Sequence, residues 1–404
     1  MKYLSGTAAA ARLNIAALSQ RVTRQGGPGA YRQVLDTLLL RLRGTGINVE
    51  EYYSFGLWRK DLDPDFLAQF LPDTRRTAFN GALLMPGNGL AGDVIENKVA
   101  TEVVLRRAGL PTTLTLAAFT KQPVADHVVH LSDAAAIRRF LANPDIFPLF
   151  AKPQNDSHAR GAVAMLCVAP DGQTVTLLNG VQASVAALAD EIVADWSDGY
   201  IFQPFYQCHA RLRKHVGPAM ASPRIVTLLT ESGVEPYYAM LRVPSKTAMH
   251  DGDSVNPRVW GLIDPQSGKM EKLRTLRDPL SPDVTHWLDP TEPLVGFELP
   301  TWHQALAAVR KAHESFPGHG ILGWDVFLTD SGPLINEVNA NPGHIYQVAA
   351  ARGLKNPDLA PLYARALAFA QNTPTSAPTL GTITVNASAD ASAEGLTQPF
   401  AGGQ

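Results

Sequence analysis

The chain has few cysteines, no long hydrophobic run and almost no net charge. Only Cys167 and Cys208 occur among 404 residues, which excludes a disulfide framework and indicates a reducing compartment. No uninterrupted apolar stretch reaches the roughly 20 residues that cross a membrane. The formal net charge of −2 gives no long-range field that would recruit nucleic acid or an anionic membrane, although it is compatible with local basic clusters.

The composition is that of a globular protein. Hydrophobic residues make up 45% and charged residues 18% of the chain, with room for two or three packed units. An Ala-rich run after Met1 superficially resembles a secretory signal, but Arg12 and Asn14 interrupt it before an apolar core develops. We therefore expect a cytoplasmic protein with no nucleic-acid partner and no membrane partner.

Residues 323–343, GWDVFLTDSGPLINEVNANPG, are the most informative segment. They predict two apolar strands joined by a hairpin loop of three residues, 330–332. In that register Asp325 lies directly across from Glu337, and Asn339 points from the same face of its strand. Carboxylate and amide oxygens gathered in this way suit Mg²⁺, which often shares its ligand shell with substrate phosphates. The alternative interpretation is a solvated hairpin face with scattered acids.

Apolar periodicity and turn residues divide the rest of the chain into elements. Helices are expected over residues 7–43, 93–107, 132–143, 184–196, 301–315 and 358–371. Strands are expected over residues 110–116, 147–152, 162–168, 174–178, 200–205, 223–230 and 235–243. Residues 372–404 are rich in Thr, Ser, Ala, Pro and Gly, which predicts a flexible tail.

A polar loop between two strands is a candidate phosphate site. Lys152 ends an apolar strand and precedes a polar loop that ends at Gly161. Backbone N–H groups and the Ser157 hydroxyl could hold phosphate oxygens, and Lys152 could neutralise them. The alternative is an ordinary surface loop with a solvated lysine, and the same holds for Lys98 on the early helix. No Walker A sequence is present.

Arg224 and Arg242 each interrupt an apolar strand. Such positions require a paired or hydrated head group. An anion clamp and two structural ion pairs explain them equally well. The eleven histidines form no metal pair, and His344 is the one best placed to reach a second substrate.

Taken in order, these features resemble the ATP-grasp superfamily. The resemblance rests on the Lys-Pro root of the polar loop, the strand with Gln203, the arginine strands, and Gly-Trp-Asp followed by Glu-Val-Asn-Ala-Asn-Pro-Gly. It covers about residues 93–370. Asn-Lys in the early helix and Pro-Arg-Ile-Val-Thr resemble the sugar-transfer associated ATP-grasp group, which is similar to glutamate ligases and glutathione synthetases. The chain departs from many relatives in having Gly323 where they carry an arginine.

The resemblance implies an α+β fold in which two α+β subdomains grip ATP, preceded by a mostly helical N-terminal region. The N-terminal region would be residues 1–92 and the ATP-grasp domain residues 93–371. Within that domain the lid subdomain would cover about 127–205 and the metal-binding subdomain about 206–371. The flexible tail of residues 372–404 would follow.

The resemblance also implies roles for individual residues. The nucleotide contacts would be Lys98, Lys152, Ser157, His158, Gly161, Gln203, Phe205 and Asn256. The ligands of Mg²⁺, two ions with Mn²⁺ as an alternative metal, would be Asp325, Glu337 and Asn339. The arginines that hold the transferred phosphoryl group and the acyl-phosphate would be Arg224 and Arg242.

The implied activity is that of an ATP-dependent carboxylate–amine ligase that acts on small molecules and produces ADP. Phosphorylation turns a poor acyl donor into an acyl-phosphate, and the protein contributes positioning and charge neutralisation. A homodimer is left open. The alternatives are an ATP-grasp kinase, a nucleotide-binding protein without turnover, and a Rossmann-type NAD-dependent dehydrogenase. The last rests on Gly-x-Gly-x-x-Gly at 87–92, which lacks the acidic residue expected about 20 residues later.

Overall fold

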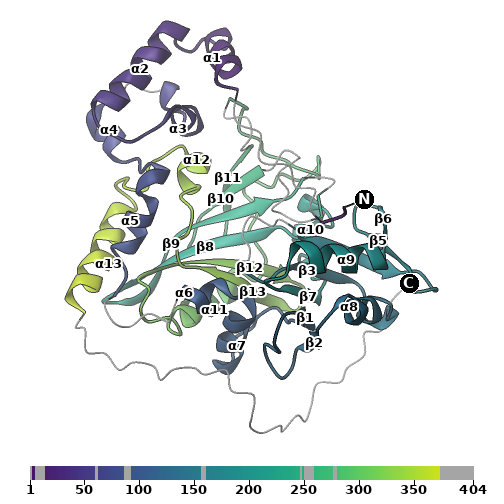
Figure 1. Ribbon diagram of the computed structural model, residues 1–404. Coiled ribbons are helices and arrows are strands. Elements are labelled where there is room, and N and C mark those ends of the chain that lie inside the picture. The colour runs from purple at the N-terminus through teal and green to yellow at the C-terminus, as the bar shows by residue number, and fades with distance from the viewer. Residues whose placement is uncertain are drawn as a thin grey trace.

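Two β-sheets, each covered by helices, form the body of the protein, and a group of helices stands at one end (Figure 1). This mixed arrangement confirms the predicted α+β fold with a helical N-terminal region. The computed structural model describes residues 2–4, 14–59, 62–85, 92–155, 161–245, 248–249, 259–275 and 280–373. None of the helices within these ranges has the length and apolarity needed to cross a lipid bilayer.

The N-terminal region consists of short helices. They are α1 (Ile15–Arg24), α2 (Ala30–Leu42), α3 (Val49–Ser54), α4 (Pro64–Ala68) and α5 (Arg76–Gly81). The prediction of one helix over 7–43 was wrong because Gly26, with φ of +80°, starts a turn that ends at Gly29. Helix α3 begins at a capping box in which Asn48 and Glu51 satisfy each other's backbone N–H groups.

The first sheet has seven strands in the order β2-β1-β7-β3-β4-β5-β6. The strands are β1 (Ala117–Phe119), β2 (Val129–Leu131), β3 (Leu149–Pro153), β4 (Val163–Val168), β5 (Thr174–Leu177), β6 (Gln182–Ser184) and β7 (Tyr200–Pro204). Helices α8 (Ala134–Leu141) and α9 (Val185–Asp195) pack on one face through Ile137 and Leu188. Strands β1, β2 and β6 were not predicted because three residues carry too little periodicity to be recognised.

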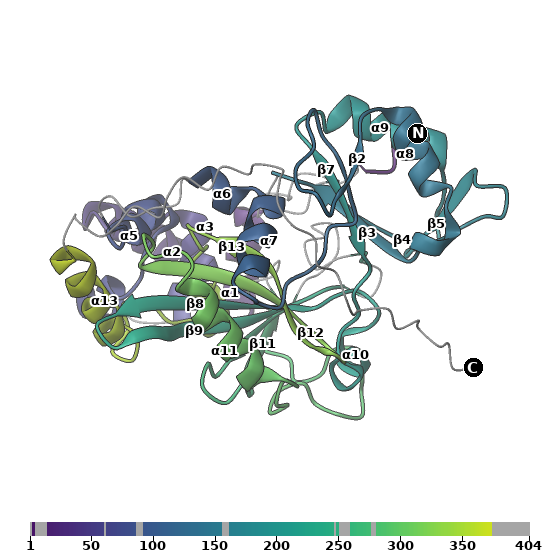
Figure 2. The same ribbon diagram turned by 90° about the horizontal axis from the view of Figure 1, so that it is seen from below.

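The second sheet has six strands in the order β11-β10-β9-β8-β12-β13, and Figure 2 shows it as a lobe distinct from the first. Its strands are β8 (Ser222–Thr230), β9 (Gly233–Val243), β10 (Val259–Ile263), β11 (Met270–Thr275), β12 (Ile321–Thr329) and β13 (Gly332–Asn339). Helices α7 (Lys98–Arg107), α10 (Ala210–Val216) and α11 (Trp302–His313) share a core with Ile225 and Trp324. Helices α5, α12 (Tyr346–Ala350) and α13 (Ala360–Asn372) share another core with Val226 and Tyr238.

The early helix is broken into two. Helix α6 (Gly92–Glu96) stops before Asn97, whose side chain accepts the N–H groups of Val99 and Ala100 and so caps α7. The single helix predicted over 93–107 was therefore wrong at this point, because Asn is a strong N-cap residue. The break makes Lys98 the first residue of α7.

The hairpin of β12 and β13 keeps the predicted pairing but not the predicted loop. Thr329 pairs with Gly332, so the loop has two residues. A β-bulge then leaves Asn336 without a partner on β12, and this one-residue shift restores the pairing of Asp325 with Glu337. The loop and the bulge offset each other, and the predicted opposition of the two carboxylates is confirmed.

Candidate active site

One row of charged residues crosses the second sheet. Arg224 on β8 pairs in register with Asp325 on β12, which pairs with Glu337 on β13. Residues directly opposite one another point to the same face of a sheet. Arg242 on β9 lies two residues beyond Met240, the register partner of Arg224, and so points to the same face. Four charged side chains from four neighbouring strands are thus gathered on one face.

Asp325 is the centre of this row and is completely buried. Arg224 donates to both carboxylate oxygens, with Nη2 at 2.7 Å from Oδ2, and Arg242 Nη2 lies 2.7 Å from the same Oδ2. Arg242 also donates to Ser222 Oγ at 2.8 Å. The two arginines therefore form one cluster around a single carboxylate, and not two separate ion pairs.

The electrostatics keep Asp325 and Arg224 charged. Burial alone raises the pKa of Asp325, but Arg224, Arg242 and Lys152 outweigh it and hold that pKa below its ordinary value. Burial alone lowers the pKa of Arg224, yet the adjacent Asp325 carboxylate outweighs it, and the pKa of this guanidinium is raised. The cluster is a preformed set of positive groups held by one negative group.

The predicted metal ligands lie together at the edge of this row. Glu337 is partly exposed, and the Asn339 side chain donates to Gly323 O at 3.4 Å. Within the described ranges, no group of three or more His, Cys, Asp and Glu side chains could hold a metal ion. Two carboxylates with an amide oxygen still fit Mg²⁺, which commonly takes one or two protein carboxylates and completes its shell with water and phosphate. Arg224 and Arg242 occupy three of the roughly four acceptor positions of the Asp325 carboxylate, so a metal ion there would share this carboxylate with the arginines.

Both predicted lysines make hydrogen bonds near the end of β3. Lys152 is buried, and its Nζ donates to Asn336 Oδ1 at 3.0 Å across the gap between the sheets. Lys98 Nζ donates to Gln154 O at 3.1 Å, two residues beyond Lys152. Asn336 was missing from the predicted site. It is the bulge residue of β13, and the alternation of strand residues carries no signal of a bulge.

Of the remaining predicted nucleotide contacts, three lie within the described ranges and three outside them. Gln203 is buried on β7, and its Nε2 lies 3.4 Å from Thr113 Oγ1. The backbone N–H of Phe205 donates to Pro148 O at 3.0 Å. Gly161 has a φ of +70°, and a side chain there would overlap the Trp196 ring, so packing already requires this glycine. Three predicted site residues lie outside the described ranges: Ser157, His158 and Asn256.

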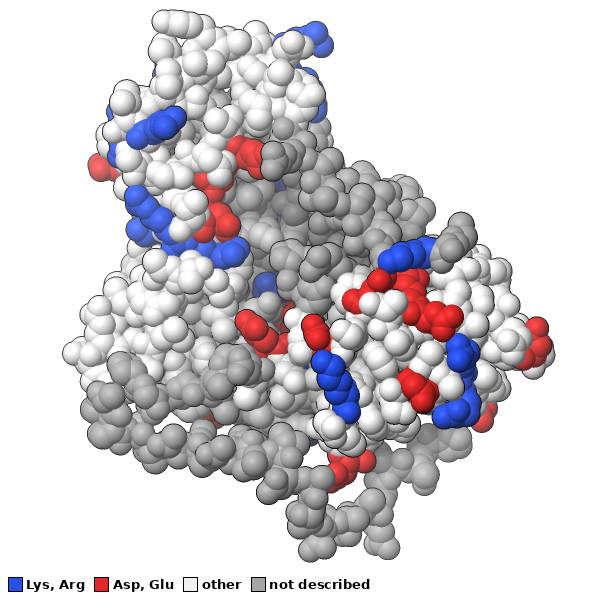
Figure 3. Space-filling model, viewed as in Figure 1, with Lys and Arg blue, Asp and Glu red and all other residues white. Residues whose placement is uncertain are grey.

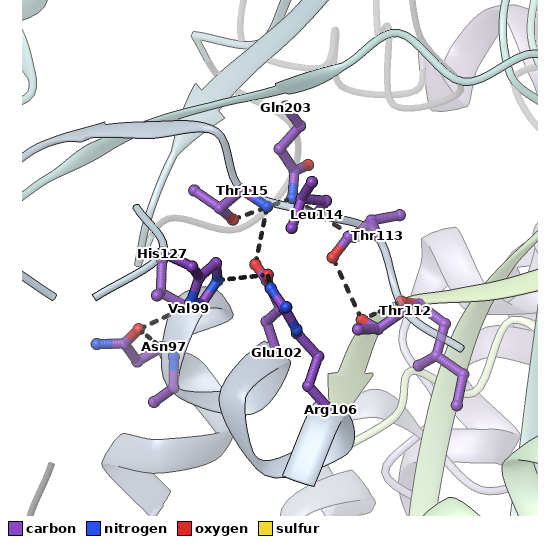
Figure 4. A network of polar contacts seen from close by, with 12 residues as sticks. Asn97, Val99, Glu102, Arg106, Thr112, Thr113, Leu114, Thr115, His127 and Gln203 are labelled. Atoms are coloured by element: carbon purple, nitrogen blue, oxygen red, sulfur yellow. Dashed lines mark hydrogen bonds and ion pairs between the residues drawn. The ribbon is translucent and has the colours of Figure 1, made fainter. Parts of the chain in front are cut away.

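Residues 110–116 form a linker between the two sheets. The prediction of a strand over these residues was wrong. The linker donates to β13 through Thr113 N and to β7 through Leu116 N, so it is hydrogen-bonded to both sheets. Figure 4 shows Glu102 of α7 beneath it, accepting from Thr115 N at 3.0 Å and lying 2.9 Å from His127 Nε2. Glu102 was also missing from the predicted residues, because its partners are set by tertiary packing.

Comparison with known proteins places this geometry in a family. The model of the sugar-transfer associated ATP-grasp family matches residues 89–359. The chain belongs to this family. Solved structures also resemble this ATP-grasp protein, while none of the curated proteins compared with it matches.

Three of these structures illustrate the resemblance. D-alanine–D-alanine ligase from Bacillus anthracis has 14% identity and a TM-score of 0.37, with 74% of each chain covered. L-amino acid ligase from Bacillus licheniformis has 14% identity and a TM-score of 0.32, covering 62% of this chain and 42% of that one. An ADP complex of N5-carboxyaminoimidazole ribonucleotide synthetase has 11% identity and a TM-score of 0.34, covering 62% and 46%. The chain thus spans less than half the length of the last two.

Residues before the matched range also touch the site of this ATP-grasp protein. Asn80 of α5 donates to Asn341 Oδ1 at 2.7 Å and to Pro342 O at 3.1 Å. Pro342 in turn lies over Gly323, where an added Cβ would be 2.8 Å from the proline Cβ. This close approach leaves no room for a side chain at position 323 unless Pro342 shifts.

His344 faces helix α5. Its ring lies edge-on to Phe79, and its Nε2 is 3.3 Å from Asn80 Oδ1. Burial, assisted by nearby Arg76, lowers the pKa of His344 to about 3, so the imidazole is neutral.

Proposed function

We propose that the protein is an ATP-dependent carboxylate–amine ligase that forms an amide through an acyl-phosphate and releases ADP. The single observation that carries the proposal is the row of Arg224, the buried Asp325 and Glu337, which lies near Lys152 of the other sheet. This row combines anion-binding and metal-binding groups within one water-poor space. Membership of the ATP-grasp family supports the use of ATP.

The phosphates would lie between the two sheets. Lys98 and Lys152 approach from the end of β3 and would neutralise phosphate oxygens. Asp325, Glu337 and Asn339 would hold Mg²⁺, whose chemistry is to offset the charge on the phosphates. We infer that Gln203 and Phe205 on and after β7 lie beside the base.

The arginine cluster would change partners when the nucleotide binds. In the structure Arg224 and Arg242 are held by Asp325. Phosphoryl oxygens compete well for guanidinium groups because both form paired, charge-assisted hydrogen bonds. The arginines would turn toward the transferred group and free acceptor positions on Asp325. Groups of this kind are each worth about 10²–10³ in rate.

The reaction is a balanced exchange of two bonds. A substrate carboxylate oxygen attacks the γ-phosphorus, the bond to the β–γ bridging oxygen breaks, and ADP leaves. The amine nitrogen then attacks the acyl carbon and loses a proton, while phosphate departs with the electrons of the acyl–oxygen bond. Because an acyl-phosphate hydrolyses readily, the sheets must exclude water during this sequence.

The proposal is tested with the full chain, ATP, Mg²⁺ and pools of small carboxylates and amines, monitoring ADP release and the mass of any amide. Glu337→Gln should reduce ADP release about 10²-fold or more with an unchanged thermal midpoint. Glu314→Gln, an exposed carboxylate after α11, is the matched control and should retain full activity.

The outcomes separate the alternatives. ADP release with a phosphorylated acceptor and no amide would support the ATP-grasp kinase. A thermal shift with Mg²⁺ and ATP but no turnover with any pool would support a binding protein. Binding of NADH without ATP would support the dehydrogenase, whose Gly-x-Gly-x-x-Gly segment falls mainly outside the described ranges.

A further inference from the structure

Helix α2 buries polar side chains and exposes apolar ones, the reverse of most helices in a globular protein. Its buried side carries Gln33, Asp36 and Leu40. Its outer side carries apolar side chains with exposed fractions between 42% and 85%: Tyr31, Val34, Leu35, Leu38 and Leu42. Their spacing of three and four residues places them on one stripe along the helix. We call these five residues the α2 stripe.

The orientation of α2 is fixed by hydrogen bonds on its buried side. Asp36 accepts from the Tyr52 hydroxyl at 2.9 Å, and Gln33 Oε1 accepts from the Tyr53 hydroxyl at 2.6 Å. Rotating the helix to bury the α2 stripe would leave these buried polar groups without partners, each at a cost of about 1–3 kcal/mol. The outward stripe is therefore a stable feature of the fold.

The exposed charges on α2 and just after it are positive. Residues 14–68, from α1 to the end of α4, contain seven basic and six acidic residues, a net charge of +1 in a chain of net charge −2, and Arg32 is paired with Asp36 on the buried side. Two of those acids, Asp36 and Glu51, are buried, whereas Arg32, Arg41 and Arg43 on and just after α2 are exposed. In Figure 3 the upper end of the molecule, where α1 and α2 lie, is mostly uncharged, with basic side chains at its margins and acidic ones lower on the same lobe.

We propose that α2 docks along its length on an anionic lipid surface, with the α2 stripe at the boundary of head groups and acyl chains. An amphipathic helix with basic residues beside its apolar face binds membranes in this way. The proposal requires no membrane-spanning helix, and it does not depend on the proposed reaction. It revises the expectation of no membrane partner, which rested on the net charge of the whole chain and not on its local distribution.

A second copy of the chain fits this surface less well. Two α2 helices packed together would bring the arginines of each copy close to those of the other, and like charges at an interface oppose association. A helix of 13 residues is about 20 Å long, and five side chains from each copy give little of the roughly 1,200–2,000 Å² that stable interfaces bury. On an anionic lipid surface the arginines face negative head groups and not each other, and the buried area is not limited to that of a second helix.

The test is flotation of the full chain with vesicles of phosphatidylcholine alone or mixed with phosphatidylglycerol. The protein should float only with the mixed vesicles, and less so at high salt, because salt screens the arginines. Leu38→Glu/Leu42→Glu should lower the partition coefficient at least tenfold, and Arg41→Glu should lower it about fivefold or more. Val181→Glu is the control, because Val181 is another exposed apolar residue, at 42%, but lies next to β6 and away from α2. This variant should bind the vesicles as the unaltered protein does.

Two results would overturn the proposal. One is failure of the unaltered protein to float with mixed vesicles at low salt, or equal flotation of Leu38→Glu/Leu42→Glu. The other is a dimer in sedimentation velocity that this double substitution dissociates, which would assign the α2 stripe to a second copy. Tyr31→Ser/Val34→Ser, at the other end of the stripe, provides a second variant that adds no charge, and thermal midpoints establish that each variant is folded.

Discussion

At the residue scale, Asp325 combines two tasks that one substitution cannot separate. It is a proposed metal ligand, and it is the counter-charge of two arginines whose side chains are only 16% and 20% exposed. Within the described ranges Glu337 has no hydrogen bond to either arginine, and it attracts Arg224 only from a greater distance than Asp325 does. Removing Asp325 should therefore affect both stability and turnover, whereas removing Glu337 should affect turnover alone.

Asp325→Ala should lower both stability and ATP turnover. It leaves Arg224 and Arg242 close together without their shared partner, and loss of one side of a buried ion pair costs about 3–5 kcal/mol. Urea denaturation and ADP release measure the two effects. Glu337→Ala serves as the comparison, with turnover lost and the urea midpoint retained. Equal midpoints for the two variants would contradict the structural role of Asp325.

Gly323→Ala should destabilise the protein by about 1–3 kcal/mol, the usual cost of overpacking. The added Cβ would lie 2.8 Å from the Pro342 Cβ and 3.3 Å from Arg224 Cδ, so the loop after β13 must shift. Gly81→Ala has open space around the new methyl group and is the control. The urea midpoints of the two variants are compared with that of the unaltered chain, and a tolerated Gly323→Ala would show that the Pro342 contact is not tight.

At the element scale, a hydrogen-bonded chain behind the charged row joins β8, β12 and α11. Trp324 Nε1 donates to Thr227 Oγ1 at 2.9 Å, and that hydroxyl lies 2.7 Å from His313 Nδ1. His313 Nε2 lies 2.6 Å from His319 O. A carbonyl can only accept, so Nε2 carries the proton and Nδ1 accepts from the hydroxyl. The chain is complete with a neutral imidazole.

Stability should fall as the pH drops from about 6.5 toward 4. Burial lowers the pKa of His313 to about 4 from an ordinary value of 6.5. In that interval the unfolded state binds a proton that the folded state refuses, so acid favours unfolding by up to about 3 kcal/mol. His344, lowered to about 3, acts in the same direction.

Urea midpoints at pH 7.5 and 5 measure this loss. His313→Gln keeps a donor and an acceptor but cannot titrate, so its midpoint should fall less between the two pH values than that of the unaltered chain. An identical fall would remove His313 as the cause.

Sequence pattern predicted elements whose information is local. Alternation on two apolar strands predicted the hairpin, but Asp325 opposes Glu337 only because a loop one residue shorter than expected is offset by a bulge. Periodicity predicted where helices lie, but not the breaks at Gly26 and Asn97. Asn336 and Glu102 escaped prediction because their partners depend on a bulge and on the path of the linker. The polar buried side of α2 was equally hidden, since Asp36 and Gln33 gain their partners from tyrosines of another helix.

At the scale of the whole molecule, residues 69–85 are interwoven with the second half of the chain. Leu71 exchanges two hydrogen bonds with the Gln347 side chain, at 2.8 and 2.7 Å. Phe79 O accepts from the Tyr363 hydroxyl at 2.7 Å, with the two rings stacked. These contacts close the core beneath α12 and α13, although the family match begins only at residue 89.

A shortened chain starting at residue 89 should therefore be poorly soluble or unfolded. It would expose the buried surfaces of Tyr346 and Val226 that α5 covers. Far-ultraviolet circular dichroism and thermal unfolding test this expectation. A chain ending at residue 373, which removes only the segment predicted to be flexible, is the control and should unfold at the original temperature. A cooperative transition in the first fragment would show that residues 69–85 are dispensable.

The hydrogen bond from Lys152 to Asn336 has a consequence for turnover. Under the proposed function, a nucleotide phosphate would have to divert a donor that already has an acceptor, so part of the attraction between Lys152 and phosphate would be cancelled by the contact given up. The amide oxygen of Asn336 would then compete with substrate and product alike for the ammonium group, and so would weaken the retention of ADP after the reaction.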